Sequence, residues 1–208
     1  MQIIDISLPI KPGMITWPGE NWVHAEAMTD FAVKGARVSR ITLGSHTGTH
    51  VDAPRHFLKD GYGVDAISPE KLVGPCSVIM VEPKNGVGIE AEDLVGIALE
   101  KRVLFKTRNS SHLFDATFYD EYVFLTQSGA KYILEKGVEL VGVDYLSVEK
   151  RGSPGHPVHT MLLKKEAVIV EGLNLAGVKA GAYSLMVAPL RFVGLDGAPA
   201  RVFLAMPL

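Results

Sequence analysis

The sequence has little of what secreted, membrane-bound or disulfide-stabilised proteins need. Its single cysteine, Cys76, excludes an intramolecular disulfide, and its position in an apolar run indicates a buried strand rather than a catalytic thiol. No stretch approaches the roughly 18 apolar residues of a membrane-spanning helix. The N-terminus carries the acidic Asp5 where a signal peptide would be basic, so we expect a cytoplasmic protein.

The chain also lacks an excess of charge of either sign. Its 21 Lys and Arg residues nearly balance 23 Asp and Glu residues, and the basic residues form no dense run. This distribution argues against nucleic acid or a membrane surface as a partner. No internal repeat, low-complexity tract or flexible linker interrupts the 208 residues, and we therefore expect one domain over residues 1–208.

Hydrophobic periodicity predicts an α/β fold. Strands are expected, from apolar and β-branched runs, at 3–8, 38–43, 77–81, 103–105, 140–143, 168–170, 185–190 and 202–205. Helices are expected over 90–101 and from an N-cap at Ser128 to Gly137. These elements add up to a mixed sheet with flanking helices, whose strand order the sequence does not give.

The strongest chemical signal is a cluster of histidines. Three of the seven histidines, His46, His50 and His56, fall close together, and Asp52 lies among them. Imidazole and carboxylate groups together suit divalent metals such as zinc, manganese or iron. The β-branched residues of this run and the proline that follows favour an extended chain over a helix. In an extended chain His46, His50 and Asp52 project from one face, so we expect them to bind metal.

An extended chain also raises a problem of distance. The Cα atoms of His46 and His50 would lie about 13 Å apart at roughly 3.3 Å per residue, which is too far for one ion. Either the chain bends at Gly48 or the site holds two metals bridged by a carboxylate. In both cases Gly48 is expected to leave room for metal. His56 follows the end of the extended segment and is better placed for proton transfer than for coordination.

The remaining ligands must come from elsewhere in the chain. Glu171 ends an apolar strand, where a carboxylate either faces water or is neutralised by a metal or partner. His159 lies twelve residues before it. Asp144, which also follows an apolar strand, is a weaker third candidate.

The segment from His46 to Phe57 resembles the signature of the metal-dependent kynurenine formamidase and putative cyclase family. Further motifs of that family follow in the expected order along nearly the whole chain: Asp5-Ile6-Ser7, Trp17-Pro18-Gly19, Val143-Asp144, Pro157-Val158-His159, Val170-Glu171-Gly172-Leu173 and Ala188-Pro189-Leu190. The resemblance implies an α/β domain of the β/β/α, swivelling-domain-like type. It also implies a homodimer or higher homo-oligomer, in which N-terminal residues of one subunit approach the partner's pocket.

The resemblance further assigns roles to single residues. His46, His50 and Asp52 match the family's first ligand cluster, His159 and Glu171 match its second, and His56 matches its catalytic histidine. The implied cofactor is one or two divalent ions per subunit, with Zn²⁺ favoured and Mn²⁺ possible.

The expected function is hydrolysis of an aryl amide. The favoured reaction converts N-formylkynurenine to kynurenine and formate in tryptophan catabolism, with a metal-bound hydroxide as nucleophile and His56 as acid and base. The aromatic residues Trp17, Trp22 and Phe57 are expected to bind a flat substrate. Two alternatives remain, a cyclic amide or lactone hydrolase of the isatin-opening kind and a metal-dependent binding protein without turnover. A non-ligand histidine favours the enzymes.

Overall fold

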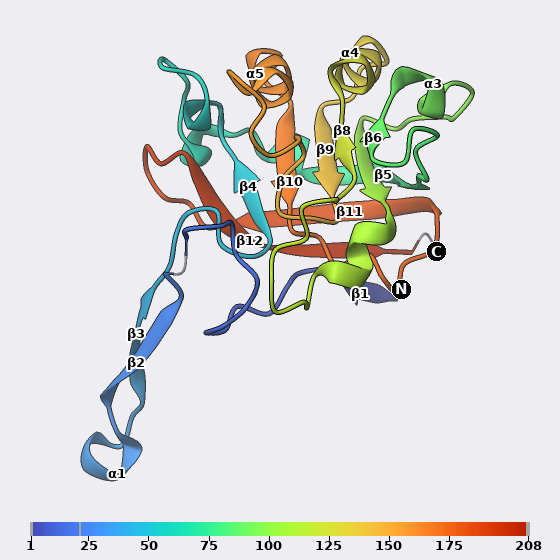
Figure 1. The fold of residues 1–208 in the computed structure, drawn as a ribbon. Coiled ribbons are helices and arrows are strands. Elements are labelled where there is room, and N and C mark those ends of the chain that lie inside the picture. The colour runs from blue at the N-terminus through green and yellow to red at the C-terminus, as the bar shows by residue number, and fades with distance from the viewer. Residues whose placement is uncertain (1, 21, 207–208) are drawn as a thin grey trace.

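Seven strands close into a barrel in the computed structural model, which describes residues 2–20 and 22–206 (Figure 1). Their order around the barrel is β12 (Gly197–Ala205), β11 (Gly181–Pro189), β5 (Val73–Met80), β7 (Arg102–Lys106), β9 (Leu140–Val143), β10 (Val168–Glu171) and β4 (His50–Asp52). The barrel closes because β4 pairs with both β10 and β12. An eighth strand, β1 (Ile3–Asp5), extends the sheet beside β12.

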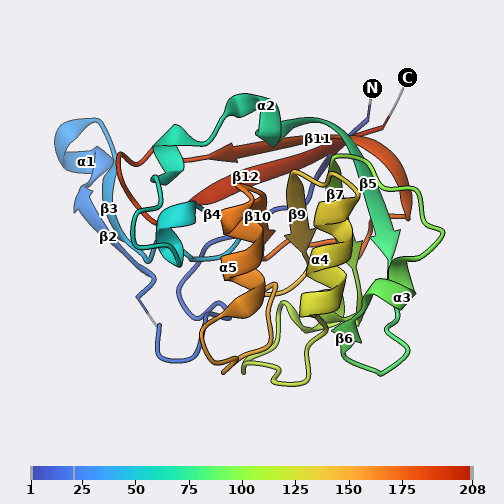
Figure 2. The same ribbon diagram turned by 90° about the horizontal axis from the view of Figure 1, so that it is seen from above.

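The four strands β5, β7, β9 and β10 run parallel, and the residues of β7, β9 and β10 are buried on both faces almost throughout. On β10, Val168 and Val170 point into the barrel, whereas Ile169 packs under the helices. Two helices, α4 (Gln127–Glu135) and α5 (Pro157–Lys164), lie side by side over this outer face (Figure 2). The mixed sheet with flanking helices is therefore confirmed, and the swivelling-domain type stays a prediction.

The remaining elements are short. They are β2 (His24–Thr29), α1 (Phe31–Lys34), β3 (Val38–Thr42), α2 (Pro69–Leu72), β6 (Gly88–Ile89), α3 (Ala91–Leu94), β8 (Phe124–Leu125) and three 3-10 turns at Pro54–His56, Val64–Ala66 and Arg108–His112. None of the described helices is long and apolar enough to cross a membrane.

Two predicted details of the helices are wrong, and one helix was missed. The helix expected over 90–101 ends at Leu94, because Val95 turns extended and Gly96 takes a positive φ. Helix α4 is capped by Thr126, whose side chain accepts from the Gly129 backbone N–H, so Ser128 lies within the first turn. Helix α5 was not predicted, since its eight residues carry too short an apolar pattern.

One hairpin leaves the body of the protein. Strands β2 and β3, joined by α1, form an arm that projects away from the barrel (Figure 1). The arm has no buried residue among those described, although it carries large apolar side chains such as Phe31 and Ile41, which are 61% and 63% exposed.

The single cysteine lies in the core, as predicted. Cys76 on β5 is fully buried, and burial raises the pKa of its thiol to about 12, which makes it unreactive.

Candidate metal centre

The centre of the site lies where β4 meets β10. The two strands are antiparallel, and Glu171 stands directly opposite His50. Directly opposed residues share a face of the sheet, and so do residues two apart on one strand. Asp52 therefore joins His50 and Glu171 on that face, and ligand atoms of all three lie within 4.8 Å of one another.

His46 reaches the same place because the chain bends before β4. Gly48 has φ +67°, a backbone conformation that glycine adopts without strain, and the bend brings the His46 and His50 rings to 5.0 Å between centroids. His46 Nδ1 lies 2.8 Å from Asp52 Oδ1. The predicted bend is thus found, but the extended chain begins only at His50. The expectation that Gly48 leaves room for metal is wrong, because a Cβ there would point at Ile10 and Met14.

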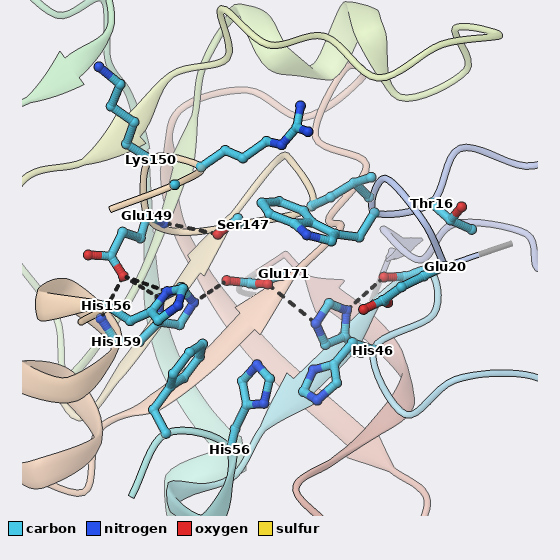
Figure 3. A pocket seen from close by; sticks show the side chains of 17 residues that line it. Thr16, Glu20, His46, His56, Ser147, Glu149, Lys150, His156, His159 and Glu171 are labelled. Atoms are coloured by element: carbon cyan, nitrogen blue, oxygen red, sulfur yellow. Dashed lines mark hydrogen bonds and ion pairs between the residues drawn. The ribbon is translucent and has the colours of Figure 1, made fainter. Parts of the chain in front are cut away.

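His159 approaches from the opposite side, on the first turn of α5. Its Nε2 lies 3.2 Å from Glu171 Oε1 and 3.8 Å from Asp52 Oδ2. The five predicted ligands therefore converge, although they come from a turn, two strands and a helix. Figure 3 labels three of them, His46, His159 and Glu171, on the wall of one pocket.

Buried charge controls protonation in this cluster. Burial lowers the pKa of His50, but the nearby carboxylates of Asp52 and Glu171 outweigh it and raise the pKa to about 10. Burial likewise opposes protonation of His159, and the carboxylates of Glu149 and Glu171 raise its pKa to about 10. Burial raises the pKa of Asp52, yet the neighbouring imidazoles hold it well below its ordinary value. The buried carboxylates of Asp52 and Glu171 are therefore stabilised by positive charge on neighbouring groups.

The donor atoms fit a divalent metal ion. Among the described residues, His50 Nε2 and Asp52 Oδ2 are buried without a hydrogen-bond partner, and both face the cluster. Buried polar atoms are seldom left without a partner unless an ion or water completes them. Three imidazoles and two carboxylates are also the ligand types of zinc and manganese sites. These observations support the predicted metal cofactor.

His56 differs from the other histidines of the cluster. It ends the 3-10 turn Pro54–His56, and its ring stacks on His46 with 3.9 Å between centroids. Neither of its ring nitrogens hydrogen-bonds to a described residue, and its Nδ1 lies 3.9 Å from Asp196 Oδ2. Burial lowers the pKa of His56, so its imidazole favours the neutral form. This arrangement suits a group that accepts and returns a proton.

A cavity of about 160 Å³ opens over the cluster. Trp17 and Phe57 line it together with His56, which Figure 3 labels, and their role in substrate binding stays a prediction. The prediction for Trp22 is wrong for this cavity, because the chain turns away into the arm. Trp22 is 53% exposed, and its ring lies beside Gly44. Asp144 also lies outside the site, where it accepts hydrogen bonds from Thr107 and Ser110 and closes a turn.

Sequence reasoning missed two carboxylates beside the ligand histidines. Glu149 Oε2 lies 2.7 Å from His159 Nδ1, and Asp196 Oδ2 lies 2.7 Å from His46 Nε2. Asp196 is 150 positions from His46, and no local pattern marks it. Glu149 is only ten positions from His159, and recognition of helix α5 would have placed it near that ring.

The chain is similar in sequence and fold to known proteins. The family model described as putative cyclase matches residues 4–150. The kynurenine formamidase of Salinibacter ruber is 36% identical over 98% of this chain and 97% of its own. A solved structure of a predicted metal-dependent hydrolase from Bacillus stearothermophilus has a TM-score of 0.83 and 36% identity over 98% of this chain and 97% of its own. Isatin hydrolase A from Ralstonia solanacearum, at 23% identity, has the same fold, with a TM-score of 0.84 over 99% of this chain and 92% of its own.

We expect Asp52→Ala to remove most of the bound divalent metal, because Asp52 lies at the centre of the cluster and faces three of its histidines. Metal content after equilibration with zinc, measured by elemental analysis, tests this expectation. Asp144→Ala is the control, since Asp144 is equally buried but lies outside the cluster. Equal metal content in the unchanged chain and in Asp52→Ala would contradict the assignment.

Proposed function

The chain belongs to the putative cyclase family, and on that basis we propose that it is a metal-dependent hydrolase of the arylformamidase type. The favoured reaction is hydrolysis of N-formylkynurenine to kynurenine and formate. The observation that carries the proposal is the convergence of three imidazoles and two buried carboxylates, with His50 Nε2 and Asp52 Oδ2 left without a hydrogen-bond partner among the described residues. His56 lies beside this cluster, and its ring nitrogens hydrogen-bond to no described residue. Residues 1–208 would work as a single hydrolase domain, with one or two ions of zinc, or alternatively manganese.

The side chains divide the chemistry between them. His46, His50, Asp52, His159 and Glu171 would hold the metal. A divalent ion supplies Lewis-acid polarisation of a carbonyl and lowers the pKa of water. His56 takes a proton from the attacking water and returns it to the leaving amine. Its Nδ1 lies on the side of Asp196, so we assign this transfer to Nε2.

The cavity walls favour a planar substrate. Phe57 and Trp17 line the cavity, and aromatic pairs contribute about 0.5–1.5 kcal/mol beyond burial. An aryl amine is also a better leaving group than an alkyl amine, so one protonating imidazole suffices. The isatin hydrolase A of Ralstonia solanacearum shares this fold, so the opening of a compact fused ring such as a cyclic amide is a second candidate function.

We expect the aryl formamide to be the best substrate. The test compares kcat/KM for N-formylkynurenine, isatin and a simple alkyl formamide at one pH with saturating zinc, and again with manganese. A clear lead for N-formylkynurenine supports the arylformamidase, whereas a lead for isatin favours ring opening. Equal rates for all three would show that Trp17 and Phe57 do not select the substrate.

We expect His56→Ala to lower kcat by about 10²–10⁴-fold, which is the usual contribution of a positioned acid–base group. Metal content and fold should stay unchanged, because the five side chains assigned as ligands would still hold the ion, although a ligand atom of His56 lies within 4.8 Å of those of His46 and Asp52. Kinetics, elemental analysis and circular dichroism on the same preparation provide the test. Loss of metal in this variant would make His56 a ligand and contradict its assignment to proton transfer.

We further propose that the chain forms a homodimer or a higher homo-oligomer. The exposed arm supports this proposal, because a two-stranded hairpin with apolar side chains gains stability when another surface covers it. The arm also continues directly from residues 16–20, which contribute to the cavity wall. A second copy of the chain is the expected partner.

Replacement of Phe31 and Ile41 together by Ser should convert the assembly to monomers. Light scattering after gel filtration measures the mass of the unchanged chain and of the variant. Val95→Ser, which changes an equally exposed apolar residue outside the arm, is the matched control and should leave the mass unchanged. A monomeric unchanged chain at micromolar concentration would overturn the proposal.

A further inference from the structure

Every ligand histidine in the cluster has one ring nitrogen turned inward and the other held by an acceptor. His50 Nδ1 donates to the Gly48 carbonyl at 2.9 Å, which leaves Nε2 facing the carboxylates. For His159 the outer nitrogen is Nδ1, at 2.7 Å from Glu149 Oε2. For His46 it is Nε2, at 2.7 Å from Asp196 Oδ2. The outer nitrogen thus differs between rings, but the inward one always faces Asp52 or Glu171.

We propose that Glu149 and Asp196 are positioning residues that set the tautomers of His159 and His46 for metal binding. The proposal rests on the proposed function, because it requires that these two imidazoles ligate a metal. A carboxylate can only accept a hydrogen bond, so it fixes the ring proton on the nitrogen that faces it. The opposite nitrogen then carries the lone pair toward the metal. Such outer partners commonly change metal affinity by about 10–100-fold.

Glu149 is buried against the first turn of α5, the helix that carries His159. It is 2% exposed, and its Oε1 accepts from the Val158 backbone N–H at 2.9 Å. His156, the N-cap residue of α5, makes no capping hydrogen bond with its own side chain and has a strained φ of +46°. The Glu149 carboxylate therefore caps the helix with one oxygen and holds the ligand ring with the other. This double contact fixes the ring relative to the helix that carries it.

Asp196 fixes His46 from the other end of the cluster. Its Oδ2 also accepts from Ser45 Oγ at 3.0 Å, and its backbone carbonyl accepts from the Ala53 N–H at 2.9 Å. The next residue, Gly197, lies opposite Asp52, and a Cβ there would approach His46 Cε1 to 2.8 Å. The loop before β12 therefore both makes room for the His46 ring and supplies its acceptor.

The variants Glu149→Gln and Asp196→Asn test the proposal, because each keeps the shape of the side chain but can present an amide donor to the ring. Zinc affinity is measured by competition with a chelator. We expect each variant to weaken zinc binding by about 10–100-fold. Ring N–H signals of ¹⁵N-histidine in the zinc-loaded protein supply a second readout. Glu149→Gln should shift mainly the His159 signal, because its other histidine neighbour, His156, is farther away at 3.9 Å, and Asp196→Asn should shift mainly the His46 signal.

Two controls separate positioning from general loss of stability. Thr126→Ala removes the cap of the neighbouring helix α4, as Glu149→Gln disturbs the cap of α5. Asp65→Asn changes a half-buried carboxylate that accepts from Gly194 in the loop that carries Asp196. Both controls should leave zinc affinity and the ring signals unchanged. If Glu149→Gln does not fold, the part-exposed Asp196→Asn still tests the proposal.

The possible outcomes distinguish this proposal from the proposed function. Zinc binding that neither variant weakens, or that the controls weaken equally, overturns the positioning role alone. Failure of the unchanged chain to bind zinc contradicts the positioning role and the proposed function together. Weakened binding with shifted ring signals supports the positioning role even if N-formylkynurenine is not a substrate.

Discussion

The burial of two carboxylates on neighbouring strands is the constraint on which the site depends. Asp52 and Glu171 are almost fully buried, and the pairing of β4 with β10 puts them on one face. Burial of an unpaired ion costs several kcal/mol, so the surrounding chain must supply positive charge. Protonated imidazoles supply it in the absence of metal, which explains why the pKa of His50 rises to about 10. A divalent ion held by the same side chains would replace those protons, so metal binding would be coupled to proton release.

The closed barrel makes this burial possible. Strand β4 is only three residues long, yet it pairs with β10 on one side and β12 on the other, so both its edges are covered. The turn before β4 also packs closely on the chain after β10. Thr49 Oγ1 donates to the Gly172 carbonyl at 2.5 Å, and Gly172 has φ +70° with no space for a Cβ beside the Gly48 carbonyl. The glycine after Glu171 thus lets the two ligand segments approach each other.

The sequence predicts the parts of the site that are local. The run from His46 to His56 could be interpreted because its ligands, its flexible Gly48 and its terminating proline are neighbours in the chain. Glu171 could be proposed because a carboxylate at the end of an apolar strand needs compensation. Asp196 could not be proposed from the sequence, because its contact with His46 arises only when the barrel closes. Hydrophobic periodicity does not encode that closure. Trp22 was misplaced for a similar reason, because proximity in sequence does not show that the chain turns away into an arm.

Hydrogen bonding of the ring nitrogens distinguishes the histidines proposed as metal ligands from His56, although the sequence alone does not separate them. Each imidazole proposed as a ligand has its outer nitrogen hydrogen-bonded to a carboxylate or carbonyl, so its ring cannot rotate without loss of that bond. His56 stacks on His46 but makes no such bond within the described part of the chain. A ligand gains from immobility because geometry sets metal affinity, whereas a proton carrier must have a nitrogen that is free to exchange partners. The fold therefore meets opposite requirements within one short segment. Strand pairing and outer hydrogen-bond acceptors fix the rings of His46 and His50. The 3-10 turn that follows places His56 at the cavity wall without such a hydrogen bond to a described residue.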